Sequence, residues 1–297
     1  MKIRIATLLT CLAGAATAQD SPFALSVSAG AEYDSNVAIS EIDQNSRLGD
    51  WATLGELALD YERQLGTATS MDVGYAYSST AYQELDTFDR ATHTAKLRLD
   101  HEFGSFDGDV SYYRIHARLD DEGLFDMDRY EVSLSRFVAK GHLLRGAITH
   151  AETTFEDRGR RDSDDQTIGV DWYYFANGVR RYFLASFDYR ESDAVGQQFD
   201  YDAHILKLKA NQRIQFRGRD ARLSLEWRYE DRAYGGLTPS IGAARDDSRS
   251  RIRLGAVLPL TDRVAIETRV TYDVHDSNLP SADYTSEVFS VQLVGDF

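Results

Sequence analysis

The residues best suited to catalysis in this sequence are its seven histidines and the acidic residues beside them. The histidines are scattered over different segments, without the spacing of a metal-ligand set or of a nucleophile and its base. Asp273, His275 and Asp276 are the one group that resembles a hydrolase site, since a carboxylate beside an imidazole can help to activate water. A histidine flanked by acids at a loop entrance is far more often a solvated surface group. We therefore predict no catalytic residue, no metal site and no cofactor.

A second set of chemically active residues consists of charges at alternate positions of alternating segments. The basic members lie in the C-terminal half of the chain: Lys207, Lys209, Arg222, Arg228, Arg251, Arg253 and Arg269. The acidic members lie in the N-terminal half: Glu56, Asp60, Asp72 and Asp109. Rings or walls of charged side chains select solutes in channels, so these sets predict a charged pore lining if they face each other. The alternative is that the same side chains form salt-bridged networks that fill and brace the interior.

The composition limits the classes of protein to which the chain can belong. It has 297 residues, a formal net charge of −15 and 42% hydrophobic residues. The negative charge argues against a nucleic-acid partner, because phosphates would be repelled. The hydrophobic fraction is too high for a disordered acidic chain. No apolar run long enough for a membrane helix follows the N-terminal segment.

The first eighteen residues have the three parts of an export signal. Lys2 and Arg4 precede an apolar stretch, and the sequence Ala-Thr-Ala ends at Ala18. We expect residues 1–18 to be a signal peptide cleaved after Ala18, which leaves 19–297 as one domain. The only cysteine, Cys11, would be removed with the signal, so the mature chain would hold no disulfide. The expected destination is the envelope of a Gram-negative bacterium.

The hydrophobic period of the remaining chain predicts its fold class. In segment 23–33 apolar and polar residues alternate, which is the pattern of a β-strand with one apolar face. Thirteen similar segments follow, so we predict an all-β fold of about fourteen strands. The predicted strands are 23–33, 51–63, 69–82, 90–103, 106–119, 129–139, 142–155, 166–176, 179–191, 201–216, 221–232, 250–260, 263–275 and 284–297.

The predicted connections alternate between short turns and long polar segments. The short ones are near 64–68, 104–105, 140–141, 177–178, 217–220 and 261–262, and the Asn-Gly pair at 177–178 suits a tight hairpin. The long ones are 34–50, 83–89, 120–128, 156–165, 192–200, 233–249 and 276–283. This alternation is typical of an antiparallel up-and-down barrel in the outer membrane, with its short turns and both termini in the periplasm.

A transmembrane barrel explains how so polar a chain can cross a membrane. Lipid offers no hydrogen bonds to the backbone, so a spanning sheet must close, and only its outer face has to be apolar. The last strand places Phe289, Val291, Leu293 and the terminal Phe297 on one face, which is similar to the C-terminal signal read by the barrel assembly machinery. The expected partners are outer-membrane lipid, lipopolysaccharide and that machinery, and no nucleic acid.

The segment after the first strand resembles a known family. Tyr33, Asp34, Ser35, Asn36 and Val37 are similar to the opening of the C-terminal barrel domain of surface lipoprotein assembly modifiers, a family of fourteen-stranded barrels. The resemblance implies a role in lipoprotein translocation, with a lipoprotein substrate or a separate periplasmic repeat protein as partner. Family members typically carry a periplasmic helical repeat domain before the barrel, and here only 19–22 separate the predicted cleavage site from the first strand. Asp34 to Asn36 are also typical turn residues.

Three hypotheses for function follow. The first is a porin-like transport or export barrel that passes a small solute, a protein or a surface lipoprotein. The second is a structural or adhesive barrel whose lumen is plugged by its own charges and whose outer loops are the functional part. The third is a hydrolase at the barrel rim, based on Asp273 and His275, which we consider the least favoured because no complete catalytic set accompanies them.

Overall fold

The computed structural model describes residues 21–297, so the predicted signal peptide and its cleavage site lie outside the described residues. Within that range the strands of the main sheet lie close to the predicted positions. They are β1 (Phe23–Asp34), β4 (Asp50–Gln64), β5 (Thr69–Tyr82), β6 (Arg90–Glu102), β7 (Asp107–Leu119), β8 (Glu122–Ala139), β9 (His142–Phe155), β10 (Ser163–Val179), β11 (Arg181–Ala194), β12 (Tyr201–Phe216), β13 (Arg219–Thr238), β14 (Ala243–Pro259), β15 (Val264–Ser277) and β16 (Tyr284–Asp296). Among these residues, no helix has the length and apolar character needed to traverse a bilayer.

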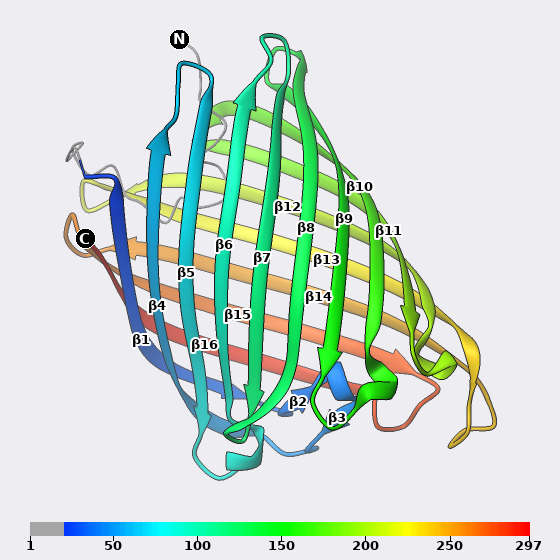
Figure 1. The fold of residues 1–297 in the computed structure, drawn as a ribbon. Helices are drawn as coiled ribbons and strands as arrows, with labels where there is room; N and C mark the ends of the chain where they lie inside the picture. The colour runs from blue at the N-terminus through cyan, green and yellow to red at the C-terminus, as the bar shows by residue number, and fades with distance from the viewer. Residues whose placement is uncertain (1–20) are drawn as a thin grey trace.

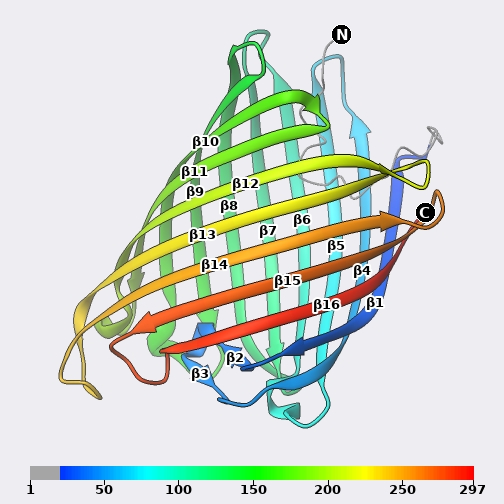
Figure 2. The same cartoon turned by 180° about the vertical axis from the view of Figure 1, so that it is seen from behind.

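The fourteen strands form one closed antiparallel barrel, which confirms the predicted fold class (Figures 1 and 2). Each strand pairs with its neighbour in sequence, and β1 pairs with β16 to close the ring. At this seam Leu25 and Phe297 exchange backbone hydrogen bonds of 3.0 and 2.8 Å. The start of β1 and the end of β16 therefore lie at the same end of the barrel as the short turns. We call this the turn end and the opposite end the loop end.

The side chains divide between the two faces of the sheet by alternation along each strand. On β16, Phe289 and Leu293 point outward and are 45% and 53% exposed, whereas the intervening Ser290 points inward and is 3% exposed. The large exposed apolar residues of the other strands follow the same rule, with aromatic rings such as those of Trp172 and Tyr272 among them. An apolar exterior around a polar interior is the arrangement of a barrel that spans a membrane.

Two of the predicted long loops are wrong. Residues 120–128 and 233–249 are mostly strand: only Asp120 and Asp121 separate β7 from β8, and only 239–242 separate β13 from β14. The polar composition of these segments suggested loops because a bilayer-spanning strand needs only about 9–11 residues. β8 and β13 have 18 and 20 residues and continue beyond the apolar band, where their outward side chains are free to be polar.

The connection between β1 and β4 folds into the barrel at the loop end. This segment, residues 35–49, is called loop 1 here and contains β2 (Ala38–Ile39), the 3-10 helix η2 (Ser40–Ile42) and β3 (Gln44–Asn45). Val37 and Ile39 have no exposed surface, because they pack in one cluster with Tyr82, Phe88 and Leu124. The rear view shows loop 1 at the lower end of the barrel, under the strands (Figure 2). Burial of these apolar side chains fixes loop 1 against the inner wall.

The closing seam leaves no room for a side chain at Gly30. A Cβ atom at this position would overlap the backbone oxygen of Val291 on β16. We expect Gly30→Ala to lower the free energy of unfolding by about 1–3 kcal/mol, since the two backbones would have to separate. Gly146→Ala is the matched control, because a Cβ there meets nothing within 4 Å. Urea unfolding of both variants in lipid vesicles measures the effect; equal midpoints would contradict the role assigned to Gly30.

Candidate functional site

The seven predicted basic residues all project into the barrel interior from β12 to β15. The strand register places them side by side: Lys207 lies opposite Arg228, and Arg228 lies opposite Arg251. Carboxylates of the same wall engage several of them. Arg228 is 2.7 Å from Glu230, Arg251 is 2.8 Å from Asp273 and Arg269 is 2.6 Å from Glu267. Arg253 and Lys209 share Glu226, at 3.7 and 3.5 Å.

The cations of this wall outnumber its acids. Arg213, Arg232 and Arg249 also point inward from these strands, whereas the inward carboxylates between Lys207 and Asp273 are Glu226, Glu230, Glu267, Asp247 and Asp273. Lys207 forms no ion pair with any residue of the described range. Arg222, the remaining member, has an interaction partner. The wall formed by β12–β15, called the basic wall here, therefore keeps a net positive charge.

The four predicted acidic residues project into the interior from β4, β5 and β7. In the fourteen-strand ring β5 and β12 are seven positions apart, so these acids face the basic wall across the lumen. Cations that were not predicted lie among these acids. Lys96 on β6 is 3.0 Å from Asp60 and 2.9 Å from Asp72.

Arg98 and Arg145 also belong to the acidic side of the lumen. Arg98 is 2.7 Å from Asp100 and 3.5 Å from Asp109. Arg145 on β9 joins Glu131 and Asp171, the latter at 3.3 Å. Arg98 and Arg145 could have been predicted to point inward from the alternation of apolar and polar residues in the predicted strands 90–103 and 142–155. The two walls are thus braced internally by ion pairs and still differ in the sign of their charge.

Loop 1 is held across the loop end of the barrel by a buried ion-pair network. Asp43 accepts hydrogen bonds from Arg245 on β14, at 2.8 Å, and from Arg161 of the 3-10 helix η4 (Gly159–Arg161). Arg245 is in turn 2.6 Å from Asp247. Burial alone would raise the pKa of Asp43, but the hydrogen bonds and charges of Arg245 and Arg161 hold it below its ordinary value. The apolar cluster holds one side of loop 1 and these arginines hold the other.

The five residues that carry the family resemblance form the entry to loop 1. Tyr33 still points outward on β1, whereas Asp34 is buried and accepts a hydrogen bond of 2.9 Å from the backbone N–H of Asn36. Ser35 and Glu287 exchange hydrogen bonds of 2.9 and 2.7 Å, which tie this turn to β16. Val37 then begins the apolar cluster. In this structure the motif acts as a turn that directs the chain into the barrel.

The residues considered for a rim hydrolase do not form one constellation. Asp273 is engaged by Arg249 and Arg251, and Asp276 lies on the outward side of β15. His275 is buried, with its Nε2 atom 3.3 Å from an oxygen of Asp247. The imidazole therefore faces an aspartate that Arg245 already binds.

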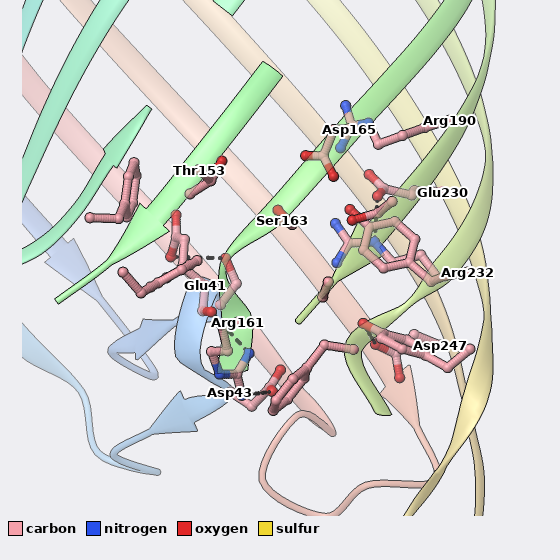
Figure 3. Close-up of a pocket in the computed structure, with 18 of the residues that line it drawn as sticks. Glu41, Asp43, Thr153, Arg161, Ser163, Asp165, Arg190, Glu230, Arg232 and Asp247 are labelled. Atoms are coloured by element: carbon pink, nitrogen blue, oxygen red, sulfur yellow. Dashed lines mark hydrogen bonds and ion pairs between the residues drawn. The ribbon is translucent and has the colours of Figure 1, made fainter. Parts of the chain in front are cut away.

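A cavity lies inside the barrel beside loop 1. Its lining comes from loop 1, from η4 and from the inward faces of β8 to β15 (Figure 3). Charged side chains of both signs point into it, with Asp165 and Arg190 on β10 and β11 and with Glu41 on loop 1. None of these three residues was singled out from the sequence. Arg190 occupies an inward position of the predicted strand 179–191, whereas Asp165 lay in the predicted loop 156–165 because β10 begins earlier, at Ser163, than the pattern predicted. The lumen at this end can therefore contact cationic and anionic groups of a solute at once.

Comparisons with known proteins identify the architecture. No protein-family model and no curated protein matches the chain. Solved structures that match include an anion-selective porin from Comamonas acidovorans, with 10% identity, a TM-score of 0.56 and coverage of 93% of this chain and 98% of that chain. OmpF of Salmonella typhi, in complex with daunomycin, matches with 12% identity, a TM-score of 0.54 and coverage of 93% and 97%. A loop L8 deletion mutant of OmpT, an outer membrane protein of Vibrio cholerae, matches with 8% identity, a TM-score of 0.53 and coverage of 93% and 99%. At these identities the likeness concerns the fold alone, which is that of a closed porin-like β-barrel.

Proposed function

We propose that this chain is an outer-membrane channel for small charged solutes, narrowed at its outer mouth by loop 1. The observation that carries the proposal is the lumen itself, where a basic wall on β12–β15 faces acids on β4, β5 and β7 inside a closed barrel. Charges in such an interior are costly unless water or solute reaches them, and those without a partner, such as Lys207, are best explained by an aqueous path. The porin-like fold agrees with this function.

The proposed orientation places the loop end outside the cell and the turn end in the periplasm. Longer connections and the 3-10 helices gather at the loop end, as in outer-membrane barrels. The apolar exterior would contact lipid, and acidic side chains beyond it, such as Asp126 and Asp128, would meet the lipopolysaccharide headgroups. We propose no catalytic role, because Asp273 and His275 are occupied by their own partners.

Lipoprotein translocation is the finer alternative within the same transport class. It rests on the five residues Tyr33–Val37, which lead into loop 1 at the mouth. A lipoprotein displayed on cells only when this barrel is co-expressed would support it. A structural barrel with a closed lumen is the competing hypothesis, favoured by the ion pairs that brace both walls.

Single-channel recording in planar bilayers tests the proposed channel. We expect discrete current steps, because the lumen is aqueous. Lys207→Gln should shift the reversal potential under a KCl gradient toward cation preference, and Glu56→Gln should shift it toward anion preference. Both shifts should grow as salt is lowered, since the Debye length rises from about 3 Å at 1 M to about 30 Å at 0.01 M. Arg181→Gln, on the outward face of β11, is the control and should leave the potential unchanged.

Absence of current from correctly folded protein would contradict the channel and favour the closed structural barrel. Shifts of the same sign in Lys207→Gln and Glu56→Gln would contradict the opposed walls.

The anchor of loop 1 gives a prediction for conductance and pH. Because partners lower the pKa of Asp43, its ion pairs contribute stability above the ordinary aspartate pKa of about 3.9, and this contribution is lost as the pH falls through the lowered value. We expect conductance to be constant near neutral pH and to rise when loop 1 is released in strong acid. Asp43→Asn should produce the larger conductance at pH 7 already.

Asp157→Asn is the matched control for that experiment. Asp157 is an exposed residue of the connection between β9 and β10, and its positive φ of 56° is one that asparagine also adopts. The same loss of charge there should leave the conductance unchanged. An Asp43→Asn channel with the wild-type conductance would show that the ion pairs of Asp43 do not hold loop 1 in the mouth.

A further inference from the structure

The cavity beside loop 1 combines small polar side chains with charges of both signs. Thr153, Ser163 and Ser192 contribute hydroxyl groups from three adjacent strands, β9 to β11. Asp165 and Arg190 extend from β10 and β11 into the same space (Figure 3). Short side chains around the two charged ones leave room for a small polar molecule.

Most charged groups of this cavity are already occupied. Glu230 is 2.7 Å from Arg228 and 2.6 Å from Arg232. Asp43 and Asp247 are bound by Arg245. These groups have little capacity left for a solute, because their partners satisfy their charge.

Asp165 and Arg190 are different, because each lacks a partner of opposite charge. The Oδ1 atom of Asp165 is buried and has no hydrogen-bond partner in the described part of the chain. The Nε atom of Arg190 donates to the hydroxyl of Thr167 at 3.3 Å, and the guanidinium also hydrogen-bonds to the hydroxyl of Tyr201. It forms no ion pair with a residue of 21–297, the carboxylate of Glu230 acting on it only at longer range. A buried polar atom without a protein partner is costly unless water, an ion or a bound molecule meets it.

The register fixes how these two charges lie relative to each other. Thr167 lies opposite Arg190, and Asp165 lies opposite Ser192. Asp165 and Arg190 are therefore diagonal neighbours on one face of two paired strands, with Cβ atoms roughly 7–8 Å apart or somewhat less. They are close enough for one small molecule to contact both, yet they do not pair with each other.

We propose that this cavity binds zwitterionic solutes of the α-amino-acid type. The ammonium group of the solute contacts Asp165, its carboxylate contacts the Arg190 guanidinium, and the neighbouring hydroxyls accept or donate the remaining hydrogen bonds. A simple anion would leave Asp165 without a partner, and a simple cation would leave Arg190 without one. The inference rests on the proposed channel function and specifies its solute class.

Isothermal titration calorimetry on the detergent-solubilised barrel tests binding directly. The probes are L-alanine, propionate, which lacks the ammonium group, and ethylamine, which lacks the carboxylate. We expect L-alanine to bind about tenfold or more tightly than either single-charge probe, because each charged hydrogen bond it adds is among the stronger kinds.

Three variants locate the site. Asp165→Asn and Arg190→Gln should each weaken L-alanine binding by about tenfold, since each removes one charged contact. Asp164→Asn is the matched control, because the neighbouring carboxylate is exposed on the outward face of the same strand. The difference in electrophoretic mobility between unheated and heated samples verifies that every variant retains its barrel.

The outcomes separate this inference from the channel proposal. L-alanine binding that is lost in both cavity variants and retained in Asp164→Asn supports the zwitterion site, whether or not current flows. Absence of L-alanine binding, equal binding of propionate, or binding unaffected by both cavity variants overturns the site. In each of these three cases the planar-bilayer current still decides the channel proposal.

Discussion

The structure depends on the hydrogen bonding of the backbone at the seam between β1 and β16. Without that seam the sheet would expose two rows of N–H and C=O groups, which lipid cannot satisfy. The pairing runs from Ser26 opposite Asp296 to Asp34 opposite Val288, so the two ends of the described chain lock the ring. Gly30 permits the close approach of the two strands. Once the ring is closed, only the outer face has to match the bilayer, and the inner face is free for other chemistry.

That freedom explains how a chain with a net charge of −15 can form an apolar exterior. Alternation sends every second side chain inward, where charges meet across neighbouring strands. Lys96 on β6 shows the result: its ammonium group is held by Asp72 of the adjacent strand β5 and by Asp60 of β4, the next strand along the wall. Such pairing stabilises the wall locally but cannot cancel the difference between the two sides of the lumen, because the cations are concentrated on β12–β15. The same side chains thus brace the barrel and leave charge of opposite sign on the two sides of its interior.

The strand pattern could be predicted from sequence because alternation depends on neighbours along the chain. The ranges 69–82, 142–155 and 201–216 agree with β5, β9 and β12 at both ends. The prediction was wrong where lipid no longer constrains the outward face of a strand. The first residues of β8 and β14 are polar and were therefore predicted as loops, although their backbones stay paired with β7 and β13. The inward position of the charged residues followed from the same alternation. The sequence could not show which of these charged residues lack an ion-pair partner, because ion pairs depend on the register between strands.

Loop 1 shows the same limit and also explains the cavity. Its sequence contains apolar residues, Val37, Ile39 and Ile42, between polar ones, and nothing local indicates that they enter the barrel. They do so because Tyr82, Phe88 and Leu124 offer an apolar surface on one side of the lumen. On the other side, Arg161 and Arg245 form ion pairs with Asp43. By taking up these arginines, Asp43 removes two cations that could otherwise bind an entering anion. Arg190 forms no ion pair with a carboxylate among residues 21–297 and hydrogen-bonds only to hydroxyl groups, so its charge is the one left for the solute of the proposed site.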